Sequence, residues 1–82
     1  MLKPKQMVAA SLTVVRDSPE TQDENIEIIQ ASRAFGPGPI PLMSFPVLAR
    51  MASTVASMRS PSDAARHAAH WLVGVSLLAG AG

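Results

Sequence analysis

Residues 36–41 read Gly-Pro-Gly-Pro-Ile-Pro, and this stretch decides how the chain is divided. Each proline removes a backbone donor and disfavours the α conformation of the residue before it, so no regular helix can run through the segment. Prolines at alternate positions also make a connector stiff and extended. We therefore expect a hinge over residues 36–46 with helices on both sides, in preference to a polyproline ligand, which would carry an exposed basic residue. The hinge residues are Gly36, Pro37, Gly38, Pro39 and Pro41.

After the hinge, residues 47–59 show the clearest helical periodicity in the chain. The sequence Ser44-Phe45-Pro46 is typical of a helix start. Apolar residues then recur at intervals of three and four, and polar residues occupy the opposite side. The pattern predicts an amphipathic helix that docks onto other chains through one stripe. The stripe consists of Leu48, Met51, Ala52, Val55 and Met58.

Residues 60–82 predict a second helix that becomes wholly apolar toward its end. Ser60 and Pro61 suit the N-cap and the first helical position. From Trp71 onward the only polar side chain is that of Ser76, so protein or lipid must enclose this tail. Residues 68–82 are shorter than the roughly 20 residues of a full membrane span, and a partial membrane contact remains an alternative to a protein core. The expected contact residues are Trp71, Leu72, Val75 and Leu78.

Before the hinge, residues 17–35 predict one helix with an acidic start. Ser18 and Pro19 mark its beginning, and Arg33 and Gly36 mark its end. Five of the six acidic residues of the chain lie between positions 17 and 27, which favours a solvated first half. A cation site and an acidic docking face for a basic partner are the alternatives, and a solvated helix start is preferred because the spacing of the acids does not match a calcium loop.

Residues 1–16 contain Lys3, Lys5 and Arg16 and no acid. Their apolar residues fit either a helical stripe or an alternating strand, and the β-branched run Thr13-Val14-Val15 favours an extended basic arm. A targeting signal is the alternative interpretation of this segment.

Composition limits the classes of function. The 82 residues are 48% hydrophobic and 16% charged, with no cysteine and a net charge of +1. The scattered arginines are not typical of a nucleic-acid interface. His67 and His70 lack a third ligand for a metal, and no nucleophile elbow or phosphate loop occurs. We therefore expect neither an enzyme nor a cofactor.

Together these patterns predict a mainly α fold of two to three short helices around a hinge, with an extended N-terminal arm and no self-sufficient core. Such a chain would need other subunits, of its own kind or another, to bury its apolar surface. We expect a structural accessory subunit within a larger, membrane-associated or soluble, assembly. A self-assembling filament, needle or pilus-type subunit and a regulatory protein acting through its acidic helix are the alternatives.

Overall fold

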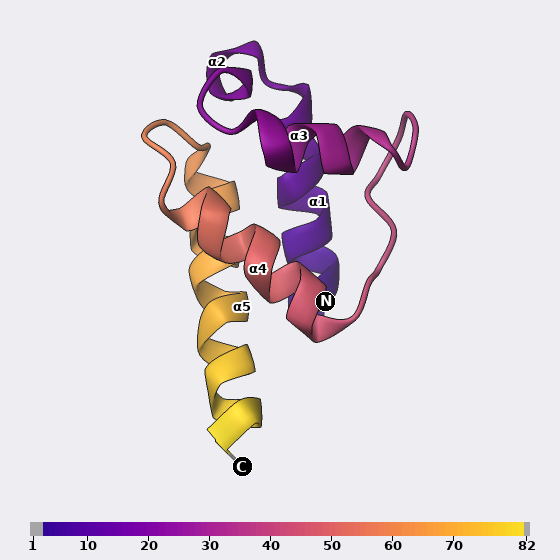
Figure 1. Cartoon of the computed structure of the whole chain (residues 1–82). Coiled ribbons are helices and arrows are strands. Elements are labelled where there is room, and N and C mark those ends of the chain that lie inside the picture. The colour runs from indigo at the N-terminus through magenta and orange to yellow at the C-terminus, as the bar shows by residue number, and fades with distance from the viewer. Residues whose placement is uncertain (1–2, 82) are drawn as a thin grey trace.

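The computed structural model describes residues 3–81, and every regular secondary-structure element in that range is a helix (Figure 1). The mainly α prediction is therefore confirmed, although the number of helices exceeds the two or three expected. The five helices are α1 (Pro4–Asp17), α2 (Pro19–Gln22), α3 (Ile26–Arg33), α4 (Phe45–Ala56) and α5 (Asp63–Ala81).

Helices α1, α4 and α5 pack against one another and enclose the core. The contact between α4 and α5 is the most extensive, and α1 packs against both, while α3 and the short α2 pack mainly on α1. Fourteen buried apolar residues form one continuous cluster. They are Val8, Ala9, Leu12, Val15, Ile40, Leu48, Met51, Ala52, Val55, Met58, Ala65, Ala68, Ala69 and Leu72. The expectation that the chain lacks a core of its own is therefore wrong.

The extended N-terminal arm is also wrong, because Pro4–Asp17 form α1. Pro4 occupies the first turn, and the Gln6 side chain accepts a hydrogen bond from the Lys3 amide at 2.9 Å, so the helix start is capped. The stripe that includes Val8, Leu12 and Val15 is buried against α4 and α5. This burial outweighs the strand preference of the β-branched residues. The mistaken prediction of an extended arm also explains why no core was expected, because α1 forms one side of that core.

The single acidic helix expected over residues 17–35 is two helices. Ser18 is the N-cap of α2, as the sequence predicts, but α2 ends at Gln22 after one turn. Asn25 then starts α3, and its side-chain Oδ1 accepts a hydrogen bond from the amide of Ile28 at 3.4 Å. An asparagine that caps a new helix end competes with continuation of the old one. After α3 the chain reaches Gly36, whose φ of +83° suits glycine and prevents the helix from continuing.

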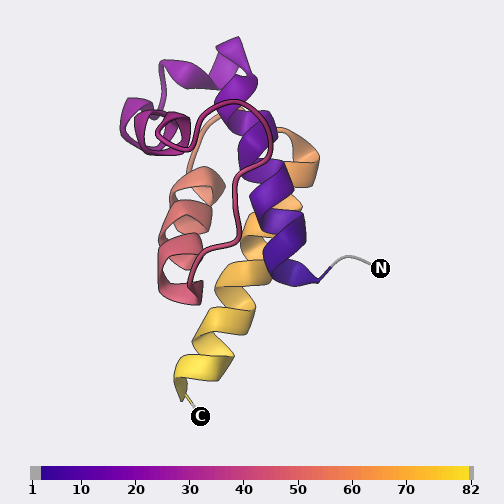
Figure 2. The ribbon, with the colours of Figure 1, turned by 90° about the vertical axis from the view of Figure 1, so that its right-hand side faces the viewer.

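The boundaries of α4 and α5 differ modestly from those expected. Helix α4 begins at Phe45 with Ser44 as N-cap, so the last two residues of the expected hinge are helical. Helix α5 begins at Asp63, two residues after the expected start at Pro61. The reason is that Ser62, and not Ser60, supplies the capping oxygen, which accepts a hydrogen bond from the Ala65 amide at 3.1 Å. The connector between α3 and α4 runs down one side of the molecule, across α1 (Figure 2).

Candidate docking site

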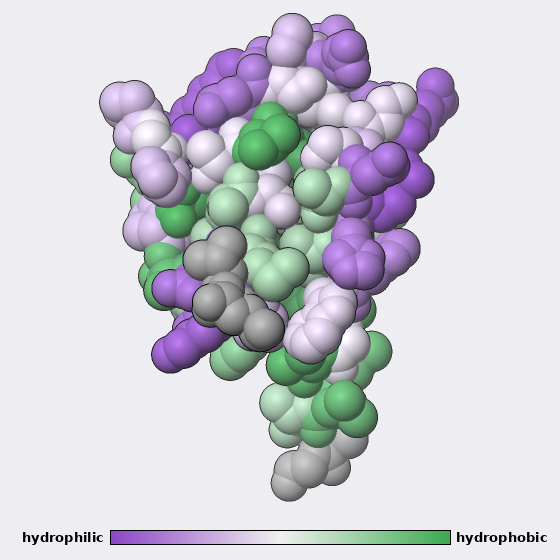
Figure 3. Space-filling view, turned by 180° about the vertical axis from the view of Figure 1, so that it is seen from behind, coloured by the Kyte–Doolittle hydropathy of each residue, from purple (hydrophilic) through white to green (hydrophobic). Residues whose placement is uncertain are grey.

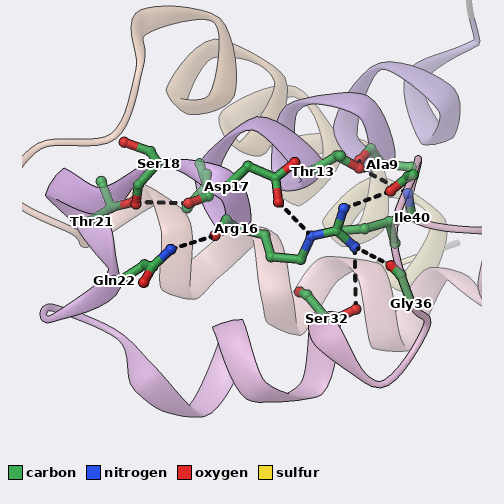
Figure 4. Close-up of polar contacts among 12 residues, drawn as sticks. Ala9, Thr13, Arg16, Asp17, Ser18, Thr21, Gln22, Ser32, Gly36 and Ile40 are labelled. Carbon is green, nitrogen blue, oxygen red and sulfur yellow. Dashed lines mark hydrogen bonds and ion pairs between the residues drawn. The ribbon is translucent and has the colours of Figure 1, made fainter.

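A buried arginine fixes the connector that precedes α4 (Figure 4). Arg16, near the end of α1, is only 4% exposed. Its Nη1 donates to the carbonyl oxygens of Gly36 at 3.1 Å and Ser32 at 3.4 Å, and its Nη2 donates to the carbonyl oxygen of Gly38 at 2.6 Å. Its Nε also donates to the exposed carboxylate of Asp17 at 3.1 Å. The planar guanidinium thus donates hydrogen bonds to three backbone carbonyl groups at once.

A second hydrogen bond holds the connector farther along. The Oγ1 of Thr13 accepts a hydrogen bond from the Ile40 amide at 2.8 Å and donates one to the Ala9 carbonyl at 3.0 Å. Ile40 itself is buried in the core cluster. Gly38 has a φ of +100°, a value that other residues adopt only with strain. The predicted hinge residues therefore lie in a segment tied to α1, and this segment places the start of α4.

The amphipathic stripe of α4 lies inside the molecule. Leu48, Ala52 and Val55 are completely enclosed, and Met51 and Met58 are nearly so. These side chains pack against α1 and α5 of the same chain. The stripe thus forms core where the sequence suggested a docking surface for other chains.

The contact residues expected in α5 divide between core and surface. Leu72 is fully buried and Val75 is half-buried, whereas Trp71 and Leu78 are 51% and 76% exposed. The neighbouring Leu77, which the sequence analysis did not single out, is 69% exposed. The last turns of α5 project beyond the other helices, which explains this exposure (Figures 1 and 2). The apolar composition of the tail indicated that Leu77 belongs to a contact surface. The spacing of the apolar residues, however, does not distinguish the exposed Leu77 from the buried Leu72.

Exposed apolar side chains gather at the end of the molecule from which α5 projects. We define the apolar end as the exposed large residues around the start of α4 and in the last turns of α5. They are Leu42, Phe45, Val47, Leu77 and Leu78. Viewed from behind, hydrophobic residues cover the projecting part, while hydrophilic residues gather at the other end of the molecule (Figure 3).

A surface hollow of about 440 Å³ connects the two parts of the apolar end. Pro46 and Arg50 line it from α4, and Val73, Ser76 and Leu77 line it from α5. A second hollow, of about 350 Å³, separates α3 from α4 and includes Glu27 and Val47. Both are open depressions in the surface with mixed polar and apolar linings. They adjoin the apolar end and do not enclose reactive groups.

Three basic side chains lie in or beside the apolar end. Lys3 and Lys5 lie at the start of α1, and the Lys5 Nζ is 4.8 Å from the centroid of the Phe45 ring, within the range of a cation–π interaction. Arg50 is exposed and lines the hollow that it shares with Leu77. Within residues 3–81 the only ion pair joins Arg16 to Asp17. None of the three basic groups therefore forms an ion pair in that range, and Arg50 shares the hollow between α3 and α4 with Glu27.

The acidic residues occupy the other end of the molecule. They belong to the end of α1, to α2 and to the start of α3, which lie together away from the projecting tail (Figure 1). Glu24 accepts a hydrogen bond from the Arg59 amide at 2.8 Å and so links this end to the segment before α5. Asp63, at the start of α5, is likewise remote from the tail. Arg16 and Arg59 lie at this end as well, beside Asp17 and Glu24, so acidic and basic groups are mixed there.

The histidines of α5 do not gather with other ligating side chains. His67 and His70 are both exposed on the surface of the helix. In the part of the chain that the structure describes, no three histidine, cysteine or acidic side chains are close enough to share a metal ion.

Helices cross a bilayer only when they are long and apolar enough to span its hydrocarbon core. None of those between residues 3 and 81 combines the length and the apolar character that a membrane crossing requires. This includes α5, the longest of the five.

Comparisons with known proteins gave no match: no family model fits the chain, and no curated protein or solved structure is significantly similar to it.

Proposed function

We propose that the chain is a small, non-catalytic accessory module that attaches to a larger assembly through its apolar end. One observation carries the proposal: Leu77 and Leu78 are 69% and 76% exposed on a helix end that projects from an otherwise complete core. Large exposed apolar patches mark interaction sites, whereas isolated surface leucines do not. Here the two leucines share one end of the molecule with the exposed residues around the start of α4.

The fold supports this role in a second way. Because α1, α4 and α5 bury a core without help from another chain, the projecting tail is not needed to complete that core. The body can then fold first and present the apolar end as a preformed surface, which lowers the entropic cost of binding.

The alternatives lack a comparable observation. A filament built on the apolar stripe of α4 would need the face that includes Leu48, Ala52 and Val55, which is enclosed in the core. A regulatory contact through the acidic end would rest on charge alone, and one of those acids, Glu24, already binds the Arg59 amide. The attachment role is therefore the function that the geometry favours.

The proposal is tested by the size of the particle that contains the chain. Extracts of the cells that make it are separated by native electrophoresis and probed with an antibody to the chain. We compare the tail variant, Leu77→Gln with Leu78→Gln, with a control variant, Ile26→Gln with Phe35→Gln, whose side chains are 56% and 46% exposed at the acidic end. Both pairs remove exposed apolar surface without a change of charge.

The expected result is a large species for the native chain and for the control variant, and a shift of the tail variant to free monomer. A native chain that migrates as a free monomer and is also absent from the sedimented membranes of the same cells would refute the attachment role. Equal migration of the two variants in the large species would refute the assignment to the apolar end.

A further inference from the structure

We propose that the surface contacted by the apolar end is the face of an anionic lipid membrane, an inference that rests on the attachment role proposed above. Three properties of the apolar end favour a lipid surface over a protein partner: its charge, its area and its shape.

The charge distribution complements an anionic surface. Lys5 and Arg50 border the apolar end, Lys3 is the N-cap of α1, and none of the three forms an ion pair among residues 3–81. Glu27 shares a hollow with Val47 and Arg50, while the other acidic residues lie away from the projecting tail. Basic groups beside exposed apolar residues are attracted to anionic headgroups while the apolar side chains enter the acyl boundary.

The area of the apolar end is too small for a stable protein interface. Five side chains that are 40–76% exposed offer an apolar area on the order of a few hundred Å². A standard protein interface buries roughly 800 Å² on each partner. A membrane has no such lower limit, because electrostatic attraction and the insertion of a few apolar side chains add together.

The shape points in the same direction. The apolar residues come from the projecting end of α5 and from the loop and first turn of α4, with an open hollow between them (Figure 1). A fluid lipid surface can close around a projecting helix end and fill such a hollow, whereas a protein partner would need a matching shape.

The geometry also limits how deeply the chain enters. No described helix can cross the membrane. The last four carbonyl groups of α5 also accept no hydrogen bond from within the helix. These carbonyls are costly in hydrocarbon, so the tail enters obliquely and keeps its end in the hydrated headgroup layer. Trp71 lies about 10 Å along the helix before Leu78. This places the only tryptophan of the chain near the headgroups, where the indole ring is favoured.

Vesicle binding by the purified full-length chain tests the inference. The probes are vesicles of phosphatidylcholine alone and vesicles of equal parts phosphatidylcholine and phosphatidylglycerol, and binding is measured by co-sedimentation and by the emission of Trp71. We expect binding to the mixed vesicles with an emission shift to shorter wavelength, and weak binding to the neutral ones. The tail variant should bind at least tenfold more weakly, and Lys3→Gln and Lys5→Gln should each weaken binding by about fivefold. The control variant should bind like the native chain.

Circular dichroism of every variant separates loss of binding from loss of fold, and all these substitutions are at surface positions. Absence of binding to anionic vesicles would overturn the inference, as would equal binding of the tail and control variants. If the native chain ignores vesicles but still occurs in a large species that the tail variant leaves, the attachment role stands and its partner is a protein. A concentration-dependent dimer that the tail variant abolishes, with no vesicle binding, would instead identify a second copy of the chain.

Discussion

Replacement of Arg16 by methionine should remove much of the stability of the fold. Methionine keeps most of the aliphatic stem but cannot donate to the carbonyls of Gly36 and Gly38, which the guanidinium reaches at 3.1 and 2.6 Å. A hydrogen bond from a charged donor contributes about 1.5–3 kcal/mol. The two short bonds therefore contribute about 3–6 kcal/mol, and relief of the buried charge lowers the expected net loss to about 3 kcal/mol. The exposed pair with Asp17 adds less than about 1 kcal/mol.

Urea and thermal unfolding followed by circular dichroism measure this loss. A chain of this length has a free energy of unfolding of about 4–12 kcal/mol, and a loss of 3 kcal/mol corresponds to a decrease in Tm of about 12–24 °C. The stability of Arg16→Lys should lie between that of the native chain and that of Arg16→Met, because one ammonium group cannot reproduce the hydrogen bonds of the guanidinium. Arg33→Met, at an exposed position near the end of α3, is the matched control and should change stability by less than about 0.5 kcal/mol. If Arg16→Met is as stable as this control, the connector does not depend on the guanidinium.

Three further substitutions test the same picture by urea unfolding. Thr13→Val keeps the shape of the side chain but removes the acceptor of the Ile40 amide, so it should cost about 1–2 kcal/mol and speed hydrogen exchange at that amide. Unchanged exchange would show that the bond is not made. Asn25→Ala removes the cap of α3 and should cost about 1 kcal/mol, whereas Asn25→Asp should cost little; equal losses would argue against capping. Leu48→Ala leaves a cavity in the core and should cost about 3 kcal/mol, while Leu42→Ala, 55% exposed, should cost under about 0.5 kcal/mol. Similar losses would place the core elsewhere.

The parts of the fold that the sequence predicted depend on local chemistry. The start of α4 follows from Ser44 and Pro46, and its buried face follows from the spacing of apolar residues. The errors arose where two local patterns compete and a distant contact decides. In α1 the helical and alternating patterns overlap, and only the presence of α4 and α5 against Val8 and Leu12 makes the helix the better solution.

The buried polar contacts could not be predicted from the neighbouring sequence for a related reason. Nothing near Arg16 in the sequence indicates burial, because its acceptors at Gly36 and Gly38 lie 20 and 22 residues away. The partner of the α4 stripe could not be assigned either, since periodicity shows that a face is buried but not which chain buries it. An exposed position within an apolar tail, such as Leu77, becomes recognisable only when the rest of the bundle ends before it.

The separation between core and tail gives the attachment proposal its physical basis. Leu72 and the residues before it on the same side of α5 are enclosed, so their apolar character is explained by the fold. Leu77 and Leu78 are largely exposed and lie outside the buried cluster, although Leu77 lines a hollow between α4 and α5, so glutamine at both positions would leave that cluster intact. Folding therefore places no demand for leucine at these two positions, yet their exposure lowers solubility and favours association. A surface contact that buries them, with Lys5 and Arg50 beside the same end of the molecule, accounts for both the residues and their position.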